Sequence, residues 1–315
     1  MSNKIFSTAA SATTASAGSG RHLGVPIEVE PGWILQLVCP TTTTFATIDY
    51  SVDVTTGAIG AQTVNTIAGI APTNSGIILT KSVMFDSTHM LSVFQDNTSG
   101  NVNAMISEWD PATHTLTSNT VTDLGITGGG VHVNMEKIDA TRYLISYGNN
   151  VNLYTQVIEV NAGTYAVTTV GTPLVTGTTS HTSQCHVVQI DATHYSISFT
   201  KIIYSVGAVA SGHFMIVEVN TGTWAVTTAT ASTALGSGAP ANAYYTSYYI
   251  DSLTWTFKIS ATKVVVFYNT GPSAKLETCY RIVDINTSTW VITVGALQLL
   301  GGQASTHMNA AYLTQ

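Results

Sequence analysis

Hydrophobic and polar residues alternate along short stretches of this chain, and turn residues separate the stretches. In the segment that contains Asp139, four such stretches lie at about residues 131–138, 143–147, 154–160 and 165–174. Alternation with a period of two residues, interrupted by Asn, Asp and Gly, is typical of antiparallel β-strands. The pattern therefore predicts a four-stranded antiparallel unit in this segment.

Two short phrases recur along the chain. The first follows the first predicted strand of a unit and reads IDATRY at 138–143, IDATHY at 190–195, FDSTHM at 85–90 and ISATKV at 259–264. The second follows the third strand and reads IEVNAGT at 158–164, VEVNTGT at 217–223, VDINTST at 283–289, SEWDPAT at 107–113 and, shortened, VDVTTG at 52–57. Self-similarity at a spacing of about 50 to 65 residues indicates a repeat array. Four-stranded antiparallel repeats around an axis are the blades of a β-propeller.

The ends of the chain decide the expected number of blades. The first phrase occurs in four copies and the second in five, and the first strand of the surplus N-terminal repeat is not visible upstream. Residues 307–314 align with residues 132–139 and then the chain stops. We therefore predict an all-β, five-bladed propeller whose ring is closed by pairing the C-terminal strand with the N-terminal blade. Closure of this kind removes free sheet edges.

Composition sharpens this picture and excludes one class of partner. Charged residues make up only 9% of the chain and the formal net charge is -7, so hydroxyl and amide groups carry most of the polarity. Without a cluster of Lys and Arg, the chain lacks the charges on which nucleic-acid affinity rests, and no nucleic-acid partner is expected. No apolar run approaches the ~20 residues that span a bilayer, so no membrane insertion is expected.

The N-terminal segment differs from the rest. Residues 1–30 are rich in Ser, Thr, Ala and Gly and are expected to form an extended arm, while residues 31–315 are expected to form the propeller. Such a composition buries little apolar area, so order in the arm would depend on a partner. A disordered leader or a remnant of cloning is the alternative. The first twenty residues do not resemble a secretory signal, because their central part is not apolar.

The cysteines and histidines carry little chemistry in this pattern. Cys39, Cys185 and Cys279 lie far apart, with no C-x-x-C pair, and we interpret them as small buried residues. Of the histidines, His132 and His307 occupy equivalent repeat positions. Imidazoles on neighbouring inner strands can converge on a ligand, but no H-x-H or H-E-x-x-H spacing fixes two metal ligands on one element. No metal site and no cofactor are expected.

Two sets of repeated acids are interpreted as structural. Asp53, Glu108, Glu159, Glu218 and Asp284 are taken to occupy the same place in five repeats, as exposed strand positions or turn acceptors. The acids of the first phrase, such as Asp139 and Asp191, are expected to accept hydrogen bonds from their own turn, because Ser260 replaces them in one copy. Equivalent acids on different blades stay apart, whereas a catalytic pair needs two carboxylates in one site. No catalytic residue is therefore expected.

Residues that do not repeat are the candidates for recognition, since irregular loops on a regular scaffold commonly carry function. Aromatic rings and amides in the variable loops suit stacking on sugars or contact with a protein, and packing of these loops against the blades is the alternative. The candidate ligand-binding residues are Tyr204, Tyr244, Tyr245, Tyr248, Asn149, Asn150, His132 and His307.

The D-A-T-x-Y phrase and the E-V-N-x-G-T phrase resemble the propeller repeats of phage and prophage virion proteins, over residues 31–315. The resemblance implies a non-enzymatic structural or adhesion component of a virion, in a tail or a capsid appendage, and an oligomeric assembly. In that setting the arm would attach to other virion proteins, and the loops would meet a glycan or protein of the host surface. A secreted or cell-surface location is the alternative to the virion.

Two other functions stay open, because a propeller does not carry one function. The first alternative is a soluble multivalent lectin with a site between each pair of blades, which predicts matching loop residues in every repeat. The second is a glycoside hydrolase, which requires paired carboxylates.

Overall fold

The computed structural model describes most of the repeat region. The described residues are 27–41, 44–53, 55–56, 58–66, 78–95, 101–127, 133–148, 152–177, 181–203, 209–236, 255–270 and 277–303. These residues form strands and turns, and none of them lies in a helix. No helix among them is long and apolar enough to cross a membrane.

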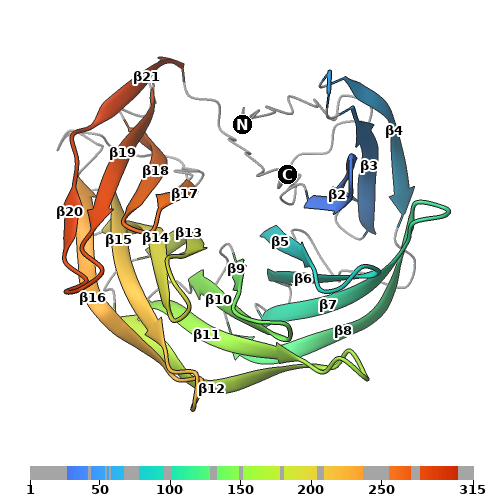
Figure 1. Cartoon of the computed structure of the whole chain (residues 1–315), viewed down its shortest axis with the longest axis horizontal. Helices are drawn as coiled ribbons and strands as arrows, with labels where there is room; N and C mark the ends of the chain where they lie inside the picture. Colours follow the sequence, from blue (N-terminus) through green and yellow to red (C-terminus); the bar gives the residue numbers. More distant parts are fainter. Residues whose placement is uncertain are drawn as a thin grey trace. The chain divides into compact units, whose positions relative to one another are not determined.

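The described strands make five antiparallel blades, each with strands in chain order, and the fold is the predicted five-bladed β-propeller (Figure 1). The first two blades belong to one compact unit, together with the turn Asn161–Val167. The first blade contains β1 (Ile27–Glu30), β2 (Trp33–Thr41), β3 (Thr44–Val52) and β4 (Ile59–Thr66). The second contains β5 (Ile78–Met84), β6 (His89–Gln95), β7 (Asn101–Asp110) and β8 (Thr115–Thr127).

The other three blades belong to a second compact unit. The third contains β9 (Val133–Lys137), β10 (Arg142–Gly148), β11 (Asn152–Val160) and β12 (Val167–Gly177). The fourth contains β13 (His181–Gln189), β14 (His194–Ile203), β15 (Val209–Val219) and β16 (Val226–Gly236). The fifth contains β17 (Trp255–Ser260), β18 (Lys263–Thr270), β19 (Glu277–Ile285), β20 (Ile292–Val294) and β21 (Gln298–Gln303). In this last blade both β20 and β21 pair with β19.

The first blade corrects one expectation about how the propeller is completed. Its first strand was expected to come from the C-terminus, but β1 (Ile27–Glu30) pairs with β2 and supplies it locally. Glu28 accepts a hydrogen bond from the Gly32 N–H at 3.1 Å and so helps to close the short turn between the two strands. Sequence alternation over only four residues was too short to reveal this strand. The C-terminal strand expected at 307–314 and residues 1–26 of the expected arm lie outside the described residues.

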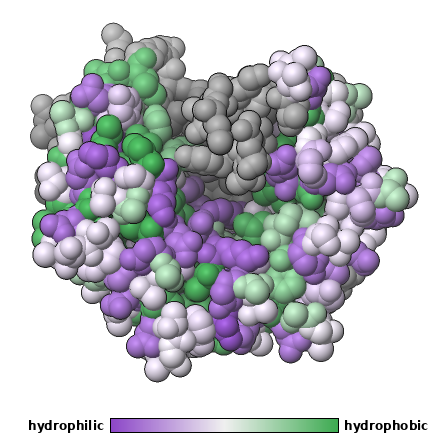
Figure 2. Space-filling model, viewed as in Figure 1, coloured by the Kyte–Doolittle hydropathy of each residue, from purple (hydrophilic) through white to green (hydrophobic). Residues whose placement is uncertain are grey.

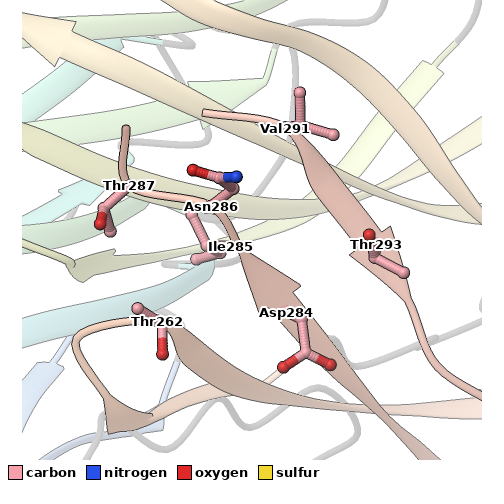
Figure 3. Close-up of a pocket in the computed structure, with 7 residues that line it drawn as sticks. All are labelled: Thr262, Asp284, Ile285, Asn286, Thr287, Val291 and Thr293. Atoms are coloured by element: carbon pink, nitrogen blue, oxygen red, sulfur yellow. The ribbon is translucent and has the colours of Figure 1, made fainter. Parts of the chain in front are cut away.

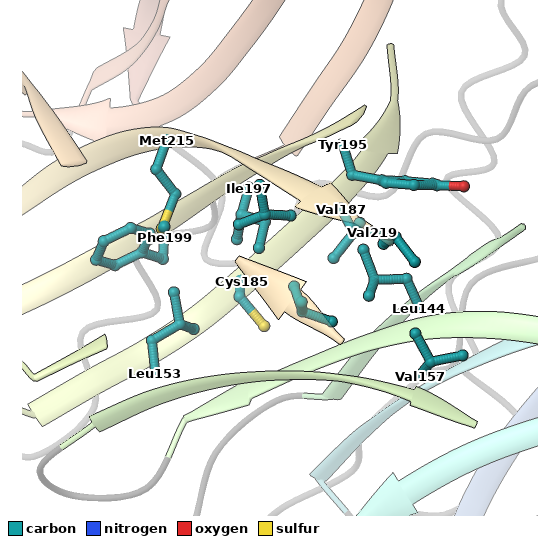
Figure 4. Packing of buried hydrophobic residues seen from close by; sticks show 12 residues of the cluster. Leu144, Leu153, Val157, Cys185, Val187, Tyr195, Ile197, Phe199, Met215 and Val219 are labelled. Atoms are coloured by element: carbon teal, nitrogen blue, oxygen red, sulfur yellow. The ribbon is translucent and has the colours of Figure 1, made fainter. Parts of the chain in front are cut away.

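Alternating residues of each strand face the neighbouring blades, and these faces form the core. Between the third and fourth blades, Leu144 and Val157 pack against Val187, Ile197 and other buried residues (Figure 4). Equivalent clusters join the first blade to the second around Leu35 and Trp109, and the fourth to the fifth around Phe214. A β-strand buried on both faces needs apolar residues at most positions, which explains the apolar runs of the second and third strands. Cys185 and Cys279 are buried, which confirms the interpretation of these two cysteines as small core residues.

The repeated D-x-T phrase forms the corner between the first and second strands of a blade. In the fourth blade the carboxylate of Asp191 accepts hydrogen bonds from the N–H groups of Thr193 (2.9 Å) and His194 (2.8 Å). Asp86 and Asp139 do the same in their blades, and in the fifth blade the Ser260 hydroxyl accepts from the Thr262 N–H at 3.2 Å. The structural interpretation of the corner acids is therefore confirmed.

The second repeated phrase forms the hairpin turn between the third and fourth strands. Its Asn or Asp accepts hydrogen bonds from backbone N–H groups two and three residues later, as Asn220 does from Gly222 and Thr223. Four residues after this Asn or Asp stands a ring-bearing residue in the left-handed backbone region, with φ between 54° and 58°. These residues are His114, Tyr165, Trp224 and Trp290. A positive φ in a bulky residue costs free energy, so other contacts must stabilise it.

Those contacts come from the corner of another blade. We call the residue that follows the corner Thr, or Trp33 in the first blade, the corner residue of its blade. In the first four blades the corner residue lies against the ring of a hairpin turn, and we call this contact the corner–turn stack. Ring centroids lie 3.7 Å apart for Trp33 and His114, 3.9 Å for His89 and Tyr165 and 3.6 Å for His194 and Trp290, and the Arg142 guanidinium lies 4.2 Å from the centroid of Trp224.

The fourth strand holds the same turn from a second side. The hydroxyl of Thr230 in β16 donates a hydrogen bond to the carbonyl of Trp290. At the equivalent place in β12, a Cβ on Gly171 would come within 2.0 Å of the Trp224 carbonyl oxygen. Gly171 therefore has to lack a side chain for the Trp224 turn to approach. Stacking and backbone contact together fix how consecutive blades pack.

Strand register corrects the alignment of the repeated acids. Glu108, Glu159, Glu218 and Asp284 each lie directly across from the corner residue of their own blade. In the first blade that position belongs to Ser51, which pairs with Trp33. Asp53 instead lies in the hairpin turn, where it accepts hydrogen bonds from Thr55 and Thr56. The shortened copy of the second phrase, at residues 52–57, had hidden this shift of two residues.

We expect the corner–turn stack of the fourth blade to be measurable as a coupling between its two residues. Trp290→Ala should lower the free energy of unfolding by about 2–3 kcal/mol, because it removes buried aromatic area and the stack. Trp290→Gly should be less damaging by about 1 kcal/mol, because glycine accepts the positive φ without strain. Urea unfolding of both variants, of His194→Ala and of His194→Ala/Trp290→Ala completes a double-mutant cycle. Strictly additive effects would contradict the stack.

The corner carboxylates should make stability depend on pH. Burial raises the pKa of Asp191, but hydrogen bonds from the Thr193 and His194 N–H groups and from the His194 ring outweigh it and hold this pKa below its usual range. A carboxyl whose pKa is lowered by folding stabilises the protein above its unfolded pKa, and this contribution is lost as pH falls through the folded pKa. Asp191→Asn should therefore unfold more easily than the wild type at pH 6, by less than about 1 kcal/mol because the site is exposed. Urea titrations should show the two proteins converging towards pH 2.5, and a constant difference would be inconsistent with this assignment.

Candidate functional site

A shallow pocket of about 430 Å³ lies on the fifth blade, beside its corner and its hairpin turn. Three segments build it: the corner, the end of β19 with the following turn, and the start of β20 (Figure 3). The residues that line it are Thr262, Asp284, Ile285, Asn286, Thr287, Val291 and Thr293.

Backbone pairing fixes the position of the lining side chains. The carbonyl of Thr262 accepts a hydrogen bond from the Ile285 N–H at 2.8 Å, which ties the corner to the end of β19. Asp284 is paired with Thr293 of β20, so their side chains share one face of the sheet. In Figure 3, Thr262 and Asp284 lie along one side of the pocket, and Val291 and Thr293 lie along the segment that leads into and through β20.

The hairpin turn supplies an amide at the edge of the pocket. The Oδ1 atom of Asn286 accepts hydrogen bonds from the N–H groups of Ser288 (3.0 Å) and Thr289 (3.2 Å). These bonds hold the side chain in place and leave the Nδ2 group facing solvent. Ile285 is buried beneath it, whereas Val291 is 57% exposed and presents its methyl groups to the surface.

The carboxylate of Asp284, which lines the pocket, is balanced by Lys263 beside the pocket. The Nζ atom of Lys263 lies 2.5 Å from Oδ1 of Asp284, and the two side chains are about half exposed. Lys263 and Asp284 face each other directly across β18 and β19, so the pair is held by strand register as well as by charge. The site therefore offers a cation, a carboxylate, hydroxyls and an amide without a net charge.

The corner beside the pocket departs from the repeat. In the other four blades the corner residue lies against a ring of a hairpin turn, but no described aromatic residue lies over Lys263. In the sequence, the first repeat carries Gly57 four residues after Asp53, where the other repeats carry a ring-bearing residue. Both departures, Lys263 and Gly57, are visible in the sequence once the register is known. The repeated phrases alone do not mark these two residues, because their alignment follows from strand pairing.

All the candidate ligand-binding residues expected from the variable loops lie outside the described residues. They are Tyr204, Tyr244, Tyr245, Tyr248, Asn149, Asn150, His132 and His307. Their role stays a prediction. Among the described residues, no group of three or more His, Cys, Asp or Glu could hold a metal ion.

Two histidines of the fourth blade lie against aromatic rings, His186 as a buried residue and His213 as a partly buried one. His186 packs against Trp255, with ring centroids 5.0 Å apart, and against Phe257. His213 stacks on Phe199, and its Nδ1 lies 2.9 Å from the Ser232 hydroxyl. Burial lowers the pKa of His213, with the Lys201 charge acting in the same direction. Both side chains fill space between strands.

Exposed apolar residues that do not line the pocket gather on the fifth blade. Ile282, Leu297, Leu299 and Leu300 are between 38% and 56% exposed. Figure 2 shows the corresponding green area near β21, at the upper left of the view. The rest of the visible surface mixes polar and apolar residues.

Comparison with known proteins gives a fold and no family. No protein-family model and no curated protein sequence matches this chain. Solved structures do match it, among them an endo-arabinase from Bacteroides thetaiotaomicron, with 12% identity, coverage of 86% of this chain and 95% of the other, and a TM-score of 0.44. A levansucrase variant from Bacillus subtilis in complex with oligosaccharides shares 10% identity over 92% of this chain and 89% of the other, with a TM-score of 0.44. A levansucrase variant from B. megaterium shares 10% identity over 90% and 85%, with the same TM-score.

These matches correct two predictions about function. The prediction of a non-enzymatic phage virion component, in a tail or a capsid appendage, is contradicted, because the three solved structures just described are named as an endo-arabinase and two levansucrases. The prediction that the protein is not an enzyme is contradicted by the same names. The resemblance to virion propellers rested on corner and turn phrases, and propellers of any function use this turn chemistry. At identities of 10–12% the likeness concerns the fold and assigns no residue a role.

Proposed function

We propose that the protein recognises a carbohydrate and that the pocket on the fifth blade holds one of its sugar residues. The observation that carries the proposal is the open corner beside Lys263, where hydroxyl, amide and carboxylate groups line a pocket that has no covering ring among the described residues. The same position in the other blades is used for a corner–turn stack.

The lining groups suit a ligand rich in hydroxyls. A sugar hydroxyl both donates and accepts hydrogen bonds, so it is best met by groups of both kinds. Asp284 accepts, the Nδ2 of Asn286 donates, and the hydroxyls of Thr262, Thr287 and Thr293 do either. The exposed methyl groups of Val291 offer an apolar surface for the C–H face of a sugar ring.

Other ligand classes fit the pocket less well. A phosphate or nucleic acid would need more positive charge than Lys263, which Asp284 already neutralises. The lining also lacks the Trp, Tyr and Arg side chains that dominate the energetic centre of protein interfaces. A hydroxyl-rich neutral ligand is the remaining class that uses most of the polar groups present.

The experiment is a screen of the full chain against an array of plant, microbial and animal glycans, followed by titration calorimetry with the best glycan. The same samples should be assayed for release of reducing sugar, so that turnover is detected together with binding. Absence of binding and of turnover across neutral glycans would overturn the proposal.

The pocket can be tested with a substitution that the fold already accepts. Asn286→Asp removes the Nδ2 donor but keeps the turn acceptor, because Asp53 and Asp110 do the same work in their own turns. Loss of one hydrogen bond should weaken glycan binding about 2- to 10-fold in calorimetry. Asn220→Asp is the matched control, since Asn220 caps the equivalent turn of the fourth blade and should leave affinity unchanged. Equal losses in both variants would place the glycan elsewhere.

A further inference from the structure

We infer that the ion pair between Lys263 and Asp284 recognises two neighbouring hydroxyl groups of the sugar, which makes a neutral vicinal diol the chemical feature that this pocket selects. The inference rests on the proposed function and names the ligand chemistry of the same site.

The geometry leaves both members of the pair with unused hydrogen-bonding capacity. The ammonium of Lys263 has three N–H donors, and among the described residues Asp284 Oδ1 is its one hydrogen-bond acceptor. The Oδ2 atom of Asp284 has no hydrogen-bond donor among those residues, and Figure 3 shows the carboxylate at the side of the pocket. Both side chains are about half exposed, so a ligand can reach them from solvent.

The other blades show that the pair is normally covered. In the third blade Arg142 holds Glu159 in the same cross-strand position, with 2.5 Å between Nη2 and Oε1, and the ring of Trp224 lies over the guanidinium. In the fourth blade His194 lies across from Glu218, and the ring of Trp290 covers the imidazole. The fifth blade keeps the cation and the acid but has no described ring over them. The two side chains are about half exposed, so the pair faces solvent among the described residues.

A vicinal diol complements this arrangement without any net transfer of charge. One hydroxyl oxygen accepts an N–H from Lys263 while its hydrogen is donated to Asp284, and the adjacent hydroxyl donates to the second carboxylate oxygen. Hydrogen bonds to charged groups are stronger than those between neutral groups, so the pair contributes specificity for the diol. Because the two charges balance, neither an anionic nor a cationic sugar gains a net electrostatic attraction, so the pair does not favour a charged sugar over a neutral one.

The test uses the full chain and the methyl glycosides of glucose, galactose and mannose, together with the monodeoxy form of the tightest binder at each ring position. Removal of either hydroxyl of one adjacent pair should weaken binding at least 10-fold, and removal of the other hydroxyls should weaken it much less. Affinity should change less than 2-fold between 50 and 500 mM salt, because a neutral ligand releases no counterions.

Variants of Lys263 and Asp284 provide the second part of the test. Lys263→Met keeps the aliphatic stem, Asp284→Asn keeps the shape, and each should weaken the glycoside at least 10-fold with little change in melting temperature. The controls are Lys137→Met, an exposed lysine of β9, and Glu218→Gln, the acid equivalent to Asp284 in the fourth blade. Both controls should bind as the wild type does.

The outcomes separate this inference from the proposed function. If Lys263→Met binds the glycoside as the wild type does, the diol inference is wrong and carbohydrate recognition remains supported. The same conclusion follows if every deoxy form loses affinity equally. Binding that weakens steeply with salt or favours anionic sugars also overturns the neutral diol. If none of the glycosides binds the wild type and the glycan array is blank, both proposals fall.

Discussion

The contact on which consecutive blades depend is the stack between a corner residue and a ring held at positive φ in a hairpin turn. The turn alone does not favour this conformation, because a bulky residue at φ near 57° is strained. The stack, with distances of 3.6 to 4.2 Å, and a backbone contact such as that of Thr230 to Trp290 offset the strain. The corners of the second, third and fourth blades are held by an Asp that accepts hydrogen bonds from two N–H groups. Blade packing therefore rests on short, locally ordered turns as well as on the apolar faces of the strands.

The fifth corner shows what the same construction does when the ring is missing. Lys263 and Asp284 keep the cross-strand pairing of a corner residue with its acid, and the turn at Asn286 keeps its capping bonds. Beside this corner lies a pocket lined by polar groups and one exposed valine. The proposed ligand site thus lies at a repeated structural position, on the same strand pairing and turn as in the other blades.

Much of the fold could be predicted from the sequence because turn chemistry is local. The carboxylate of Asp139 accepts hydrogen bonds from N–H groups two and three residues later, so its phrase predicts a corner wherever it occurs. Local chemistry was less reliable where a phrase was shortened. Asp53 appeared to match Glu108, but strand register places it with the turn acceptors and puts Ser51 across from Trp33. The four-residue strand β1 was missed for a related reason, since so short a stretch carries little periodicity. The pocket could not be predicted from the sequence, because strand register is needed to identify Lys263 as the corner residue without a described ring over it.

The sequence by itself determined the all-β class, the number of blades and the structural role of the corner acids, because each follows from residues that are neighbours in the chain. Only the tertiary structure decided which ring contacts which corner residue, how the absence of a side chain at Gly171 makes room for the Trp224 turn, and that the side chains of Lys263 and Asp284 are half exposed. The first two of these features join residues of different repeats, and their contacts depend on how closely two backbones approach. Periodicity and propensity describe a strand or a turn, whereas the distance between two strands of different blades is set by packing.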